Sequence, residues 1–254
     1  MIDSHCHLTD ERIDTEKTIA NMQADGLTAL VTVGYDMPTS RRCLEIATTY
    51  PQVYATVGVH PSDVGGMTDA DLDELKVLCQ NPRVVAVGEI GLDYHYDDTD
   101  REKQKYWLCR QLELVEAVNL PAVFHLRDAY DDMLQIITAH RDKLTRGGVM
   151  HCFSGSVETA KKYLDMGFYV SLSGTVTFKN AKKTVEVAKI VPDDRLLAET
   201  DCPYLAPEPY RGQLNVPHYV RHTIQKLADI RQRDFGYIEE ITQRNTKDLF
   251  FRMK

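Results

Sequence analysis

The sequence lacks several features that would indicate particular classes of protein. Its 254 residues include six cysteines, none in a C-x-x-C pair, which excludes the dense disulfide framework of small secreted domains. No apolar run approaches the roughly 20 residues of a membrane-spanning helix, and the first residues lack a signal-peptide pattern. We therefore expect a reduced, cytoplasmic protein with no membrane segment.

An excess of positive charge is also missing. The 38 acidic residues outnumber the 30 lysines and arginines, which gives a formal net charge of -8. A protein that binds nucleic acid through a broad basic surface has the opposite balance. Any phosphate chemistry would therefore have to take place in a local site.

Linkers and repeats are absent as well. No stretch is rich in Ser and Gly or in Pro, and no repeat is visible beyond alternating strands and helices. With 43% hydrophobic residues, the chain can bury a large core. We expect one domain over residues 1–254, with a monomer as the simplest oligomeric state.

What the sequence does contain is short apolar runs, rich in β-branched residues, that alternate with longer stretches of helical periodicity. This pattern is typical of βα units around a parallel sheet. The predicted strands are Ile2–His7, Ala29–Gly34, Tyr54–Val59, Val84–Ile90, Ala122–Leu126, Gly148–His151, Tyr169–Leu172 and Leu196–Glu199. The predicted helices are Thr15–Ala24, Pro38–Tyr50, Ala70–Gln80, Arg101–Val118, Tyr130–His140, Val157–Met166, Asn180–Ile190, Val216–Gln232 and Tyr237–Phe251. Together they predict an α/β fold, a (β/α)8 TIM barrel, with an extra C-terminal helix.

Residues with metal-ligand chemistry occur at the strand ends, where TIM barrels gather their active sites. His5 and His7 are two apart on the first strand and so face the same side. Glu89 closes the apolar run of the fourth strand, where a buried carboxylate needs a partner such as a metal ion. Other strand-end residues are His60, His125, His151, Glu199 and Asp201. These side chains suit zinc, manganese or magnesium, and they are numerous enough for two divalent ions.

Cysteines lie beside several of these residues. Cys6, Cys152 and Cys202 each neighbour a predicted ligand in the chain. Neighbours along a strand point to opposite faces of the sheet. We therefore expect small buried side chains at these positions, and no thiolate ligands.

Five segments resemble the signatures of TatD-type metal-dependent deoxyribonucleases, which have an amidohydrolase-like TIM barrel. They are DSHCHL from Asp3, GVHP from Gly58, GEIGLDY from Gly88, HCFSG from His151 and ETDCPYL from Glu199. They span almost the whole chain in the right order. The resemblance implies two divalent ions held by His5, His7, Glu89, His125, His151 and Asp201. It also implies that Glu89 bridges them, with the first-strand histidines and Asp201 on one ion and the other two histidines on the second.

The same resemblance implies hydrolysis of phosphodiester bonds in DNA. Asp201 would orient or deprotonate the attacking water. An acidic protein that neutralises few phosphates fits single-stranded or frayed ends, with 3′–5′ exonuclease-like action. Arg211 can pair bidentately with a phosphate, and Asn215 can cap the helix that begins at Val216. The alternative is an ordinary β-to-α loop with a surface arginine. Further candidate substrate-binding residues are His60, Asp93, Tyr94 and Arg127.

The sequence departs from the family pattern at two places. Gln213 and Leu214 follow Arg211-Gly212 where relatives commonly carry basic residues, and Leu126 occupies a position where Ser is usual. Both changes reduce local positive charge. The alternative function is a di-metal amidohydrolase or phosphoesterase that acts on a small molecule. A non-catalytic metal-binding scaffold is a further alternative, but it would predict the loss of some ligands, and all six are present.

Overall fold

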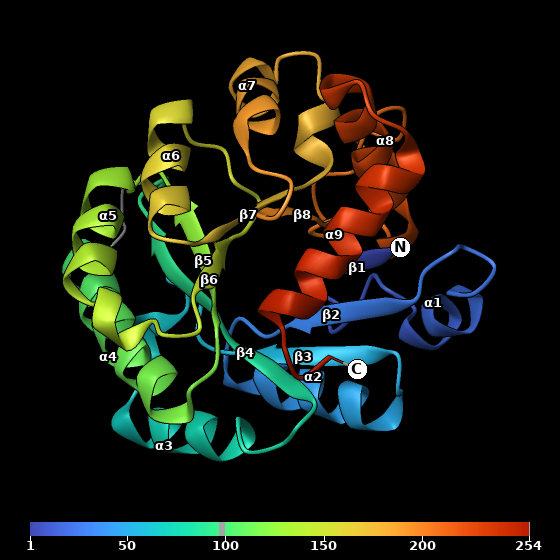
Figure 1. Ribbon diagram of the computed structural model, residues 1–254. Helices are drawn as coiled ribbons and strands as arrows, with labels where there is room; N and C mark the ends of the chain where they lie inside the picture. The colour runs from blue at the N-terminus through green and yellow to red at the C-terminus, as the bar shows by residue number, and fades with distance from the viewer. Residues whose placement is uncertain (97–99, 254) are drawn as a thin grey trace.

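Eight parallel strands form one sheet that curves into a nearly closed barrel, with helices around it (Figure 1). The computed structural model describes residues 1–96 and 100–253. The strands are β1 Ile2–Cys6, β2 Ala29–Val33, β3 Val53–Val57, β4 Val84–Asp93, β5 Ala122–Arg127, β6 Gly148–Met150, β7 Tyr169–Leu172 and β8 Leu196–Ala198. They pair in sequence order, and a bridge between Cys6 and Cys202 joins β1 to the segment after β8. The predicted TIM barrel is confirmed.

The helices follow the predicted order. The α-helices are α1 Thr15–Asn21, α2 Met37–Thr49, α3 Asp69–Leu78, α4 Arg101–Val118, α5 Tyr130–Ala139, α6 Val157–Asp165, α7 Lys182–Ile190, α8 Val220–Arg231 and α9 Phe235–Leu249. Short 3-10 helices are η1 Val64–Gly66, η2 Arg141–Lys143, η3 Gly174–Thr177 and η4 Pro217–Tyr219. No helix within residues 1–96 and 100–253 has both the length and the apolar character needed to cross a bilayer.

Polar side chains fix the starts of several helices. Asp36 accepts a hydrogen bond from the Thr39 backbone N–H at 2.7 Å, and the Thr39 hydroxyl accepts one from the Asp36 backbone N–H at 3.0 Å, which forms a capping box at α2. Asp14, Asp100 and Ser156 cap α1, α4 and α6 through their side chains. All of these caps lie in loops that follow a strand, so they order the end of the barrel where the strands finish.

The buried apolar residues form two clusters. The larger one lies between the sheet and the surrounding helices and includes Leu30, Leu75, Leu112 and Ile224. The smaller one contains strand residues together with only three others, Leu249, Phe250 and Met253, from the end of α9 and the segment after it. Inward-facing strand side chains thus fill the barrel interior, as its small diameter requires.

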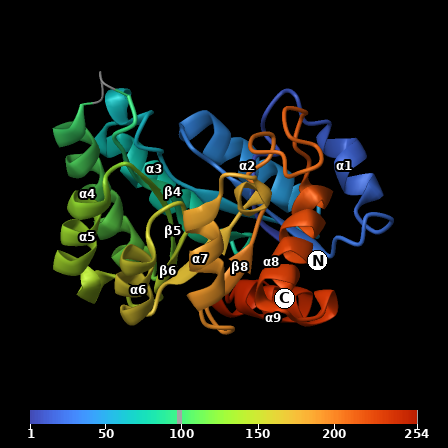
Figure 2. The same cartoon turned by 90° about the horizontal axis from the view of Figure 1, so that it is seen from above.

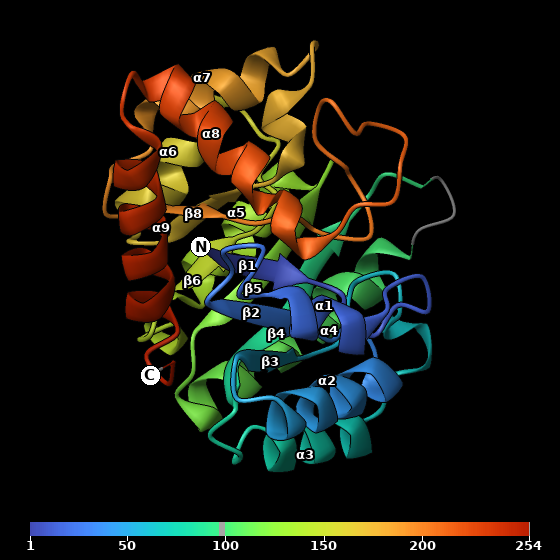
Figure 3. The same ribbon diagram turned by 90° about the vertical axis from the view of Figure 1, so that its right-hand side faces the viewer.

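The C-terminal helix closes one end of the barrel. Phe250 is fully buried against the strand residues of the smaller cluster, and the Met1 amino group donates a hydrogen bond to Glu239 of α9 at 2.9 Å. Figures 2 and 3 show α9 at the end opposite the long segment after β8, drawn in orange. The predicted extra helix is therefore present, and it leaves the carboxyl ends of the strands open.

Strand β4 is longer than predicted. It continues past Ile90 to Asp93 because it keeps pairing with β5 after a shift in register between Val87 and Ile90. A Cβ atom added at Gly91 would lie 1.9 Å from the His125 carbonyl oxygen, so only glycine permits this approach of the two strands. Glu89 consequently lies inside β4, which corrects the prediction that it ends the strand.

Other differences concern element boundaries. The predicted helix Val216–Gln232 is divided into η4 and α8, since Pro217 begins a short turn before the α-helix. Strands β6 and β8 each end one residue earlier than predicted, and β3 ends at Val57 instead of Val59. His60, His151, Glu199 and Asp201 therefore lie in the loops just beyond their strands, still at the same end of the barrel.

Candidate metal centre

The six predicted ligands converge at the carboxyl ends of the strands. His5 belongs to β1, Glu89 to β4 and His125 to β5. His7, His151 and Asp201 follow β1, β6 and β8 directly or within three residues. His5, His7, Glu89 and His151 are buried, while His125 and Asp201 are partly buried. The barrel therefore brings together residues that are as many as 196 positions apart in the printed sequence.

Glu89 lies between two pairs of histidines. Its Oε1 atom is 2.7 Å from Nε2 of His151 and 2.9 Å from Nδ1 of His125. Its Oε2 atom is 3.5 Å from Nε2 of His5 and 4.0 Å from Nε2 of His7. Each carboxylate oxygen thus faces one pair, which is the arrangement that a bridging ligand requires.

Asp201 completes one side of this arrangement. Its Oδ1 atom is 3.4 Å from Nε2 of His7 and 3.7 Å from Nε2 of His5. Its backbone has a φ of 58°, in the left-handed region that few non-glycine residues adopt. The preceding Thr200 is fixed by the buried Asp3, which accepts hydrogen bonds from its backbone N–H at 2.9 Å and its hydroxyl at 2.5 Å.

His5 provides a test of whether a cation fits this site. Both ring nitrogens of His5 are buried, and neither has a hydrogen-bond partner among the residues that the structure describes. Nε2 nevertheless faces carboxylate oxygens of Glu89 and Asp201 at 3.5 and 3.7 Å, distances too long for good hydrogen bonds. A cation between these groups would satisfy all three, so the donor set fits a metal ion.

Several groups of three residues within the described part of the chain could hold such an ion. In each group, one ligand atom from every member lies within 4.8 Å of the others. The groups near the strand ends are His5-His7-Asp201, Glu89-His125-His151, His60-Asp93-His125 and His5-His151-Glu199. Histidine and carboxylate ligands suit zinc and manganese, and a carboxylate-rich site suits magnesium.

The carboxylates of the centre are ionised at neutral pH. Burial raises the pKa of Glu89, but the charge of His151 and the hydrogen bonds with His125 and His151 hold it well below its ordinary value. Burial also raises the pKa of Asp201, and its hydrogen bond with His7 outweighs that effect and lowers it. The site therefore offers negative ligands to a cation.

A cavity of about 640 Å³ opens directly above the centre. Its wall includes Glu89, Asp201 and four of the histidines at the strand ends. Tyr96 and Tyr204, which also line the cavity, are 58% and 50% exposed, so part of each ring is open to solvent. Arg127 is the only arginine or lysine among the described residues that line the cavity. Substrate would therefore meet little positive charge from the protein itself.

The structure places some of the predicted substrate-binding residues at this cavity. His60, Asp93 and Arg127 line it. Asp93 accepts a hydrogen bond at 3.0 Å from Nε2 of His125, so it lies against a predicted ligand and not at the outer edge. Burial and the charge of His125 lower the pKa of His60 to about 3, which keeps that imidazole neutral.

Three others lie elsewhere. The guanidinium of Arg211 stacks over Phe178 at 4.0 Å from the ring centroid. The Tyr94 hydroxyl donates to Asp132 at 2.7 Å. Asn215 is fully buried, and its amide donates to the carbonyl oxygens of Thr200 and Tyr204. None of the three lines the cavity within the part of the chain that the structure describes. Asn215 instead holds the loop that carries Asp201.

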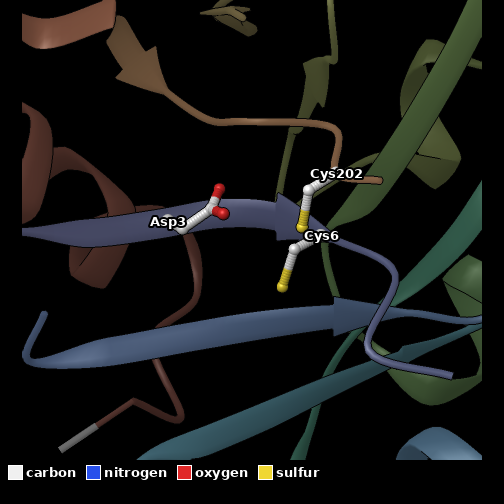
Figure 4. Close-up of side chains that lie close together, drawn as sticks. All are labelled: Asp3, Cys6 and Cys202. Carbon is white, nitrogen blue, oxygen red and sulfur yellow. The ribbon is translucent and has the colours of Figure 1, made fainter. Parts of the chain in front are cut away.

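Sequence reasoning assigned no role to Asp3, which the structure places behind the centre. Figure 4 shows it on β1 near Cys6 and Cys202, which lie together where β1 meets the segment after β8. Both cysteines are fully buried, and the Cys6 thiol donates to the Val31 carbonyl at 3.3 Å. Both oxygens of Asp3 already accept hydrogen bonds, so this carboxylate supports the backbone and has no free ligand atom. The sequence signal that could have identified Asp3 is its position just before His5 and His7 in the chain.

Comparison with known proteins agrees with this geometry. The family described as TatD related DNase matches residues 2–251. The chain is 44% identical over 252 residues to the uncharacterized metal-dependent hydrolase YabD of Bacillus subtilis, with 98% of each chain covered. It is 36% identical over 256 residues to the uncharacterized metal-dependent hydrolase YcfH of Escherichia coli, with 98% of this chain and 95% of that protein covered.

A solved structure shares the fold closely. The crystal structure of YjjV, a TatD homolog from Escherichia coli K12, superimposes with a TM-score of 0.94 at 31% sequence identity, and 99% of this chain and 98% of that chain are covered. The family match and the alignments with these relatives cover nearly the whole chain, including all six candidate ligands. The chain therefore belongs to the TatD family of metal-dependent hydrolases.

Proposed function

We propose that this protein is a deoxyribonuclease that hydrolyses phosphodiester bonds at single-stranded or frayed DNA ends, in a 3′–5′ direction, with two divalent ions. The ions would be held by His5, His7, Glu89, His125, His151 and Asp201. The observation that carries the proposal is Glu89, since its two oxygens face two separate histidine pairs. The name of the matching family supports DNA as the substrate.

The residues of the site would have different roles in hydrolysis. Bound zinc, manganese or magnesium would place positive charge beside the phosphoryl oxygens and make water more acidic. Asp201 is ionised and lines the cavity, so it can orient the attacking water and accept its proton. Glu89 and the histidines keep the reacting end of the cavity polar, while the fully buried residues below exclude water from the barrel.

The cavity rim supports an unpaired DNA end as the substrate. Arg12 lies over the exposed Tyr204 ring at 4.9 Å, and Arg127 lies over the exposed Tyr96 ring at 5.9 Å. Exposed aromatic rings stack on nucleobases without regard to sequence. Because Arg127 is the one Arg or Lys among the described lining residues, few phosphates can be neutralised at once.

One experiment tests cofactor and substrate together. Metal content is measured by elemental analysis, and the same preparation is incubated with single-stranded DNA labelled at either end. We expect bound divalent metal, and mononucleotides released from the 3′ end, with loss of activity in chelator and recovery on adding metal. An active metal-loaded protein that releases products only from the 5′ end would refute the polarity, and a loaded protein inactive on all DNA would refute the substrate.

A small-molecule ester or amide is the second candidate substrate. The observation in its favour is the scarcity of cations around a cavity of about 640 Å³. The same kind of centre can activate water against carbonyl as well as phosphoryl groups. A panel of oligonucleotides, phosphomonoesters, amides and lactones, tested with one metal-loaded preparation, distinguishes the two by their kcat/KM values.

A further inference from the structure

Glu199 is a buried carboxylate that the six-ligand set does not include. It follows β8 directly and is 1% exposed. Its backbone is fixed, because its N–H donates to the Leu172 carbonyl at 3.2 Å and its carbonyl accepts from the Thr223 hydroxyl at 3.4 Å. A buried carboxylate is costly without partners, so its contacts should reveal its role.

Those contacts lead to His151. Oε1 of Glu199 lies 3.3 Å from Nδ1 of His151 and accepts the Cys152 backbone N–H at 2.7 Å. On the other side of the ring, Nε2 of His151 lies 2.7 Å from Oε1 of Glu89. The imidazole is thus held between two carboxylates, one inside the proposed ion site and one behind it.

His5 extends this arrangement. Its ring stacks on that of His151, with centroids 3.9 Å apart and an interplanar angle of 11°. One ligand atom of His5, one of His151 and one of Glu199 lie within 4.8 Å of each other. The Oε2 atom of Glu199 is buried and has no hydrogen-bond partner among the described residues. The Glu199 carboxylate therefore lies close to both stacked rings.

We propose that Glu199 is a positioning residue for the ion site. It would accept a hydrogen bond from Nδ1–H of His151, so that when an ion is bound the lone pair of that ring would lie on Nε2, on the side of Glu89. A carboxylate behind a metal-binding histidine fixes its tautomer and orientation and makes it a stronger ligand. This inference rests on the proposed ion site, but it does not depend on whether DNA is the substrate.

The competing explanation is that Glu199 only holds the loop after β6 through the Cys152 N–H. Glu199→Gln separates the two roles, since the amide keeps the shape and an oxygen that can accept from Cys152 but loses the charge. We expect Glu199→Gln to weaken zinc or manganese affinity by about 10- to 100-fold, with little change in the unfolding temperature of the metal-free protein. Glu186→Gln, on an exposed residue of α7, is the matched control and should bind metal as wild type does.

Metal affinity is measured by competition with a chelating indicator, without any substrate. Affinity of Glu199→Gln within twofold of wild type would overturn the positioning role, while a wild type that binds no metal would instead defeat the proposed function. If Glu199→Gln does not fold, nitrogen-15 NMR of the zinc-loaded wild type can instead show which ring nitrogen of His151 carries the proton. A proton on Nδ1 of His151 supports the inference, and coordination through Nδ1 overturns it.

Discussion

At the scale of the residue, three buried acids of the site have separate tasks that depend on what surrounds each carboxylate. Glu89 faces histidine nitrogens through both oxygens, so we propose it as the central ligand. Asp3 is occupied by hydrogen bonds from backbone and hydroxyl groups, and it fixes Thr200. Glu199 lies behind His151. Similar side chains thus differ in function because they meet different partners.

The residue whose removal should affect turnover most is Asp201. Asp201→Asn keeps the size of the side chain but removes the charge and the proton acceptor, so kcat should fall by about 10²- to 10⁴-fold. The unfolding temperature should change by only a few degrees. Cleavage of labelled single-stranded DNA and thermal unfolding are the measurements. Asp165→Asn, on the exposed side of α6, is the control, and near-normal turnover of Asp201→Asn would remove Asp201 from its proposed role.

That the candidate ligands lie together was predictable at this scale, because side chains at the carboxyl ends of the strands converge in any TIM barrel. The position of Arg211 was not predictable in the same way. Its guanidinium stacks on Phe178, and that contact joins two loops with no pattern in the sequence to connect them. The burial of Asn215 is similar, since its amide bonds to carbonyl oxygens of a loop whose path only the structure gives.

At the scale of the element, strands and helices followed from apolar periodicity, whereas the extent of β4 depended on pairing. The predicted strand ends at Ile90, because Gly91-Leu92-Asp93 follows the end of an apolar run. The structure keeps these residues in register with His125, Leu126 and Arg127 of β5. Tertiary pairing thus overrode local signals. It placed Asp93 against His125 and extended the strand beyond Glu89.

The close approach of β4 and β5 makes Gly91 a sensitive position. Gly91→Ala would place its Cβ atom 1.9 Å from a backbone oxygen, at a φ of 152° that side chains rarely adopt. We expect the free energy of unfolding to fall by about 3 kcal/mol or more, together with metal affinity, since His125 belongs to the displaced strand. Urea unfolding is the measurement. Gly65→Ala, where the structure places nothing within 4 Å, should change stability by less than about 0.5 kcal/mol in either direction.

At the scale of the whole molecule, the two ends of the barrel serve different purposes. The end that α9 covers is apolar and closed, while the other carries the candidate metal centre and the cavity (Figure 3). Stability and chemistry are therefore separated along the barrel axis, as expected for this fold. Changes at the closed end should alter stability with little effect on the site.

Phe250 and Phe251 test this separation with adjacent residues of one type. Phe250 is fully buried in the barrel cluster, whereas Phe251 is 45% exposed. Phe250→Ala should lower the free energy of unfolding by about 3–5 kcal/mol, and Phe251→Ala by less than about 1.5 kcal/mol. Neither change should alter metal affinity in the folded protein. Equal losses in the two variants, measured by urea unfolding, would contradict the proposed closure by Phe250.

The charge of the molecule makes a prediction about how DNA binds. With a net charge of -8 and a single arginine at the described cavity wall, the protein offers few cations to phosphates, and we expect no more than about three phosphate contacts. Each contact on single-stranded DNA contributes about 0.7 to the slope of log K against log salt concentration, so the magnitude of the slope should be no more than about 2. Anisotropy of a labelled oligonucleotide with Asp201→Asn protein measures this slope without cleavage.

Arg127 should account for one of these contacts. Arg127→Ala, in the same Asp201→Asn background, should weaken binding and reduce the slope by about 0.7, because one phosphate is no longer neutralised. Arg211→Ala is the comparison, since its guanidinium rests on Phe178 outside the described lining of the cavity and should leave the slope unchanged. A wild-type slope steeper than about 4 would require a basic track for the strand. The described cavity wall has no such track. A slope this steep would therefore contradict binding at a DNA end and indicate binding along the length of the strand.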